Sequence, residues 1–221
     1  MIIPRFRTDY TGEFVVIKTT FRNGIKEQER EWVANPTPAD ETLNRAAVIG
    51  VGKSRSVFKW WKLQDHNGGL LGSNKLKTYG SGDTYKRMIL DSYMTNEQSI
   101  LIDIIESKYD EANLVYTTGS NCVRYPDHFY LLPYSPYLDD SVAAAYLAAF
   151  DGNKEIFLLG YDQDPANDIT SETTQLINLV TAYSNVKWNI VSDWNLITPS
   201  LTALPNVKAM TYSEFITTCD I

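Results

Sequence analysis

One short segment carries the residue types that bind phosphate groups in many proteins. It follows a run of apolar residues and reads Gly50-Val51-Gly52-Lys53-Ser54-Arg55. Two glycines let the backbone turn tightly, and a helix that begins here would point its N–H groups at an anion. Lys53 and Arg55 add positive charge. The segment therefore predicts a phosphate site, but a plain strand-to-helix turn with solvated cations explains the same pattern equally well.

The same segment is close to a P-loop, the nucleotide-binding motif written GxxxxGK[ST] in one-letter code. Residues 47–54 read AVIGVGKS, so only the first position departs from the motif, with Ala47 in place of glycine. Residues 47–49, however, continue an apolar strand, and Lys53 would lie inside the start of the helix. The P-loop is therefore the less favoured interpretation, and Asp162 would be its magnesium-binding acid.

Two further polar residues follow stretches that we expect to be buried strands. Asn74 comes after residues 68–73, and Asp162 ends the apolar stretch 155–162, which also contains Gly160. In open parallel sheets, ligands bind beyond the carboxyl ends of the strands. Both side chains are well placed to bond a ribose, a base or a metal-bridged diphosphate. Capping of the following turn is the competing interpretation for each of them.

Composition argues against several other kinds of function. The chain of 221 residues has a formal net charge of −7, which disfavours a surface that binds nucleic acid by neutralising its phosphates. Two cysteines, Cys122 and Cys219, and two histidines, His66 and His128, are too few for a disulfide framework or a transition-metal site. No signal-peptide pattern or apolar run of membrane-spanning length is present. We therefore expect a cytoplasmic protein with no metal site and no membrane or nucleic-acid partner.

Short apolar strands alternate with amphipathic helices along residues 41–221, a pattern typical of an α/β fold. Such a series predicts a Rossmann-like, largely parallel sheet with helices on both faces. The expected strands are 45–50, 68–73, 88–93, 113–118, 128–133, 155–162, 188–191 and 206–210. The expected helices are 54–63, a helix that opens at 96, 142–150 and a helix capped at 171.

The N-terminal residues have a different pattern. Phe14–Phe21 and Ile25–Val33 are expected strands around the turn Arg22-Asn23-Gly24, which predicts a β-hairpin. Pro36 and Pro38 then form a stiff linker. Since an isolated hairpin is marginally stable, we expect it to pack on the body or on another subunit. The predicted division is a hairpin with linker, residues 1–40, and an α/β domain, residues 41–221.

Three segments resemble a known superfamily. They read RAAVIGVGKSRS, GGLLGSNKLKTYG and DDSVAAAYLAAFDGNKEIFLLGYDQD, and lie mainly within residues 46–164. They are similar to Rossmann-like proteins of the bacterial sialyltransferase and 6-hydroxymethylpterin diphosphokinase type. That resemblance implies a nucleotide, with or without magnesium, in a pocket formed by Gly50, Gly52, Ser54, Asn74 and Gly160, with Asp162 at the rim. Val51 replaces the asparagine usual in that family, and no histidine follows Asp162 to act as the general base of glycosyl transfer.

The hairpin and the stretch YTTGSNCVRYPDHFYLLPYSP also resemble small proteins of tailed bacteriophages, particularly those of cyanobacteria. This implies a phage origin and a location in the host cytoplasm or on the virion. We expect a protein that binds a nucleotide or another phosphorylated ligand through Gly50, Gly52, Lys53, Ser54, Arg55, Asn74, Gly160 and Asp162. Glycosyltransferase- or diphosphokinase-like activity is left open. The alternative is a non-catalytic protein that pairs with itself or with a virion protein through residues 1–35.

Overall fold

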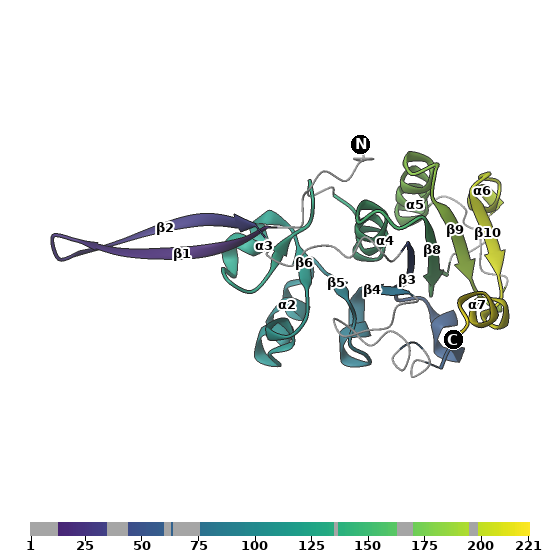
Figure 1. The fold of residues 1–221 in the computed structure, drawn as a ribbon, viewed down its shortest axis with the longest axis horizontal. Helices are drawn as coiled ribbons and strands as arrows, with labels where there is room; N and C mark the ends of the chain where they lie inside the picture. Colours follow the sequence, from purple (N-terminus) through teal and green to yellow (C-terminus); the bar gives the residue numbers. More distant parts are fainter. Residues whose placement is uncertain are drawn as a thin grey trace.

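The computed structural model describes residues 13–34, 44–59, 63, 76–134, 137–162, 170–194 and 199–221, with the backbone alone for residues 13–18 and 30–34. Within these residues ten strands form one sheet, in the order β10-β9-β8-β3-β4-β5-β6-β7-β1-β2. All neighbours from β10 to β7 pair in parallel, whereas β1 pairs antiparallel with both β7 and β2. The predicted Rossmann-like, largely parallel α/β fold is confirmed (Figure 1).

The strands are short in the body and long in the hairpin. Their bounds are β1 Glu13–Arg22, β2 Ile25–Ala34, β3 Arg45–Ile49, β4 Lys77–Gly80, β5 Ser92–Met94, β6 Val115–Thr117, β7 Tyr130–Leu131, β8 Glu155–Leu159, β9 Lys187–Val191 and β10 Val207–Met210. The α-helices are α2 Gln98–Glu106, α3 Gly119–Arg124, α4 Asp140–Phe150, α5 Ser171–Ala182, α6 Pro199–Thr202 and α7 Tyr212–Cys219. Three 3₁₀ turns complete the described elements: η1 Lys53–Val57, η3 Gly82–Lys86 and η4 Tyr109–Glu111.

The order of the strands places a switch point at the middle of the parallel sheet. From β3 the chain proceeds through β4, β5 and β6 to β7, then returns through α4 to β8 on the other side of β3. The loops after β3 and β8 therefore start side by side at the carboxyl edge, and the chain continues from them toward opposite ends of the sheet. Ligands of doubly wound folds bind at this kind of position.

Helices cover both faces of the sheet, as Figure 1 shows. One buried cluster joins α4 and α5 to Ala46 and Val48 of β3, and a second joins α2 and α7 to Ala47 and Ile49. Because both faces of β3 are covered, four successive residues of this strand are fully buried. No helix of the described residues is both long enough and apolar enough to cross a membrane.

The N-terminal hairpin extends away from the body (Figure 1). Its strands pair over ten residues, but β1 meets β7 at one pair, Phe14 opposite Tyr130. The turn residues Asn23 and Gly24 have φ of 54° and 77°, as a tight hairpin turn requires. All side chains from residue 19 to 29 are exposed. The predicted hairpin is confirmed, while the predicted domain boundary lies outside the described residues and stays a prediction.

Some predicted elements differ from the structure. Of the helix expected at 54–63, the first part is the 3₁₀ turn η1, which ends at Val57 before the buried Phe58; residue 63 is helical, and residues 60–62 lie outside the described residues. Residues 88–91 precede β5 and are not a strand: Met88 and Leu90 are buried and Ile89 is exposed, an alternation that imitates a strand. The stretch 68–73 lies outside the described residues. The short strand β4 and the helix α7 were not predicted.

Candidate functional site

The loops after β3 and β8 touch each other closely. The Gly50 N–H donates to the Leu159 carbonyl at 2.8 Å, and the Gly52 N–H donates to the Gly160 carbonyl at 2.7 Å. A Cβ at Gly52 would lie 2.5 Å from the Gly160 oxygen, and one at Gly50 would lie 2.7 Å from it. Gly160 itself has φ of +69°. All three glycines are therefore explained by the close approach of two loops.

Asp162 and Ser54 bond to each other beside these glycines. The Ser54 N–H donates to Oδ2 of Asp162 at 2.7 Å, and the Ser54 hydroxyl donates to Oδ1. Ser54 is fully buried. The Asp162 carboxylate thus caps the start of η1, where a bound anion would otherwise lie. The P-loop interpretation is wrong, because residues 47–49 belong to β3 and are buried.

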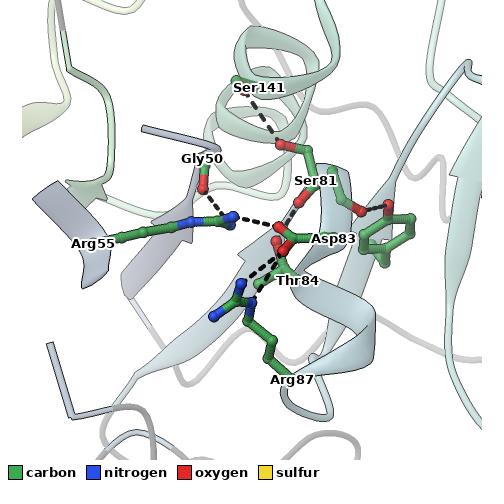
Figure 2. A network of polar contacts seen from close by, with 9 residues as sticks. Gly50, Arg55, Ser81, Asp83, Thr84, Arg87 and Ser141 are labelled. Atoms are coloured by element: carbon green, nitrogen blue, oxygen red, sulfur yellow. Dashed lines mark hydrogen bonds and ion pairs between the residues drawn. The ribbon is translucent and has the colours of Figure 1, made fainter. Parts of the chain in front are cut away.

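Arg55 lies on the other side of the loop, largely buried with 12% of its side chain exposed. Its Nη1 donates to the Gly50 carbonyl at 3.0 Å, and its Nη2 pairs with Asp83. Asp83 also accepts from Nε and Nη2 of Arg87, each at 3.0 Å. Figure 2 shows one carboxylate joining two guanidinium groups. Partial burial acts to raise the pKa of Asp83, but the bonds from Arg55 and Arg87 outweigh it and hold this pKa below its usual value.

The turn η3, which carries Asp83, is itself fixed in place. The Thr84 hydroxyl donates to the Ser81 carbonyl, and the Tyr93 hydroxyl donates to the Gly82 carbonyl. A Cβ at Gly82, whose φ is +64°, would lie 2.3 Å from a methyl carbon of Val51. The η3 turn therefore packs directly on the loop that follows β3.

An open hollow of about 410 Å³ lies next to this network. Its lining is Val51, Gly52, Lys53, Arg55, Ser56, Arg87 and Trp194. Trp194, on the loop after β9, has 40% of its surface exposed. Lys53 makes no ion pair with any residue that the structure describes. The lining thus contains three cationic side chains, two of which pair with Asp83, in a chain with a net charge of −7.

The rest of the carboxyl edge of the sheet is acidic. Asp140, at the start of α4, accepts from the Thr95 hydroxyl at 2.7 Å and from the Asn96 N–H at 3.0 Å. Burial raises the pKa of Asp140, and burial followed by the nearby charge of Asp139 raises that of Glu172 at the start of α5. An anion that approaches this edge is therefore attracted to the hollow and repelled by the starts of α4 and α5.

Two solved structures are similar to the chain. One is "Structural analysis of the sialyltransferase CstII from Campylobacter jejuni in complex with a substrate analogue, cytidine-5'-monophosphate", with 16% identity over 74% of this chain and 86% of that chain and a TM-score of 0.45. The other is the same enzyme in complex with CMP-3FNeuAc, with 13% identity over 76% and 89% and a TM-score of 0.44. No family model matches the chain, and no curated protein matches it. A likeness of this size carries no statement about the ligand or the reaction of this chain.

The predicted site residues thus fall into two groups. Gly50, Gly52, Ser54, Gly160 and Asp162 contact one another. Lys53 and Arg55, together with Gly52, line the hollow. Asn74 lies outside the described residues, and ligand binding by all of these residues stays a prediction.

Sequence reasoning missed three residues of the hollow and its network. Asp83 and Arg87 are four positions apart, the spacing of an ion pair on a helical turn, and this signal was available. Trp194 carries no such signal, because only the fold brings the loop after β9 to the loop after β3.

The remaining candidate for chemistry lies elsewhere in the molecule. Nδ1 of His128, just before β7, is 2.7 Å from Oδ2 of the nearly buried Asp110 in η4. Both residues precede their strands, β7 and β6, and so lie toward the amino edge of the sheet, away from the hollow. Among the described residues, no group of three or more histidine, cysteine or acidic side chains could hold a metal ion.

Proposed function

We propose that the chain binds a small phosphorylated molecule, of the nucleotide class, in the hollow beside η1. The observation that carries the proposal is that Lys53, Arg55 and Arg87 line one hollow at the carboxyl edge of the sheet. This edge is where α/β proteins of this topology bind their ligands. An excess of positive charge here has no counterpart in the composition of the chain as a whole.

The cations have donors left for a ligand. Each guanidinium group has five N–H groups, of which the contacts with Asp83 and Gly50 use two in Arg55, and the contacts with Asp83 use two in Arg87. Lys53 contributes an ammonium group on a flexible stem. Together they suit the several oxygens of a phosphate or diphosphate.

Trp194 supports a ligand that has an apolar or aromatic part as well. Its backbone N–H donates to the Ser192 hydroxyl at 3.1 Å, which holds the residue just beyond β9. The half-exposed indole stands beside the cations in the same hollow. A flat apolar surface next to positive charge is suited to the base or sugar of a nucleotide.

The proposal concerns ligand binding and does not include the transfer of a group from the ligand. Asp162 accepts from the N–H and the hydroxyl of Ser54, which supports a capping role for its carboxylate. Glycosyltransferase- or diphosphokinase-like activity, the involvement of magnesium and the role of Asn74 therefore stay predictions. So does a phage origin.

Calorimetric titration tests the proposal. The probes are pyrophosphate, CMP, CTP, ATP and GTP, each with and without magnesium, at low ionic strength. We expect saturable binding of at least one of them, weakened by added salt because charge attraction contributes to it. No heat with any probe at either ionic strength would contradict the proposal.

A second candidate function is self-association or partner binding through the hairpin. Ten-residue strands that pair with the sheet of the body at one residue pair, with residues 19–29 exposed, suit addition to a neighbouring sheet. Phe21 and Ile25 near the tip are 74% and 66% exposed. We expect the full chain to have the mass of an oligomer in solution, and the variant without residues 1–35 to have the mass of a single protomer. The same protomer-sized mass before and after deletion would count against self-association.

A further inference from the structure

Asp83 is the only acidic side chain that contacts the cations of the hollow among the described residues. Its two oxygens lie on different arginines, Oδ1 on Arg55 and Oδ2 on Arg87. Since 43% of the Asp83 side chain is exposed, its charge also faces the solvent from which a ligand arrives. A bound anion would therefore lie close to a fixed negative charge.

We propose that Asp83 sets how strongly the hollow attracts anions, by partly neutralising Arg55 and Arg87 and by opposing an anion more strongly the more charge it carries. This inference rests on the proposed function. Asp83 bonds both Arg55 and Arg87, so it offsets part of the positive charge that these two residues and Lys53 bring to the hollow.

The position of Asp83 is built into the fold. Gly82, which precedes it, has a left-handed backbone, and no other residue type would pass Val51 without displacing it. The Tyr93 hydroxyl holds the Gly82 carbonyl, and Arg55 is held by the Gly50 carbonyl as well as by Asp83. Arg55 therefore keeps one anchor when the charge of Asp83 is removed (Figure 2).

The test is Asp83→Asn, which removes the charge and keeps the size and one acceptor oxygen. Titrations use inorganic phosphate and pyrophosphate at low ionic strength. We expect the affinity for pyrophosphate to rise about tenfold, as a unit charge a few ångströms away in a half-exposed site implies. The gain for phosphate should be smaller, because it carries less charge. A purely structural role of Asp83 would not make the change depend on the charge of the probe.

Asp103 provides a matched control. It is 42% exposed, and it pairs with Lys86 at 2.7 Å outside the lining of the hollow. Asp103→Asn changes the net charge by the same amount, and we expect less than a twofold change for either probe. Asp83→Glu, which keeps the charge, should leave the affinities for phosphate and pyrophosphate close to those of the wild type. Asp83→Ser replaces the asparagine variant if that variant does not fold.

The outcomes separate the two proposals. Binding by the wild type with an unchanged or lower affinity in Asp83→Asn overturns the role of Asp83 and leaves the proposed function standing. Binding by Asp83→Asn alone supports the role of Asp83 and contradicts phosphate binding by the native hollow. An equal gain in Asp103→Asn, or no binding by any variant, overturns the inference.

Discussion

The two sides of the loop after β3 differ in what they contact. On one side the N–H groups of Gly50, Gly52 and Ser54 bond to β8 and the loop that follows it. On the other side Lys53 and Arg55 face an open hollow. Glycines and a helical turn are the familiar signs of a phosphate cradle, yet here they close the gap between two loops.

The comparison shows that a glycine-rich turn has to be judged by what its N–H groups already bond. The Asp162 carboxylate takes the N–H and the hydroxyl of Ser54, so this end of η1 is neutralised by the protein itself. The positive charge that remains available belongs to two segments, with Lys53 and Arg55 in η1 and Arg87 just after η3. Any ligand site on this edge therefore depends on charge and shape more than on the glycine motif.

The largest expected effect is that of Gly52→Ala, which would force the two loops apart. Its Cβ would lie 2.5 Å from the Gly160 carbonyl oxygen and 2.7 Å from Cγ of Asp162. Overpacking of this kind costs about 3 kcal/mol of unfolding free energy. Urea denaturation measures it, and Ser56→Ala, exposed on the same turn, should change the free energy by less than about 0.5 kcal/mol. A cost below about 1 kcal/mol would show that the loops can separate, and that the closed side could open to a ligand.

Asp162→Ala should come next. The variant leaves the buried N–H and hydroxyl of Ser54 without partners, which costs about 2 kcal/mol of stability. The affinity for pyrophosphate should not fall, because Asp162 does not line the hollow. Both quantities are measured on the same preparation, by urea denaturation and calorimetry. Lost pyrophosphate binding with unchanged stability would instead place the ligand at Asp162.

Lys53→Gln should have the smallest effect on stability and a clear one on binding. Since Lys53 makes no ion pair with the described residues, the unfolding free energy should change by less than about 0.5 kcal/mol. The affinity for pyrophosphate should fall about tenfold, or about 1.4 kcal/mol. Lys59→Gln, exposed and outside the lining, is the control. Equal losses in the two variants would indicate a general charge effect with no site at the hollow.

The sequence predicted the helices and strands whose residue pattern lies within one short segment. The alanine-rich segment before Gly152 became α4, and the continuous apolar stretch after it became β8, because both are buried in full and need little from distant residues. The helix expected after Ser54 stopped at η1, since Phe58 turns inward to stack on Tyr212, a residue over 150 positions later in the chain.

The candidate site was predicted in position but not in composition. Lys53 and Arg55 were placed correctly at the carboxyl end of β3. The partner of Arg55, however, is Asp83, and the aromatic wall is Trp194; both come from other strands, and no spacing in the sequence links them. The bond between Ser54 and Asp162, 108 positions apart, is likewise visible only once β3 and β8 lie side by side.

The most direct test is a crystal structure of the protein grown with pyrophosphate. We expect phosphate density in the hollow, in contact with Lys53 and Arg87, with the bond between Ser54 and Asp162 intact. Density on the N–H groups of Gly52 and Ser54, with the Asp162 carboxylate displaced, would contradict it and restore the glycine turn as the phosphate site.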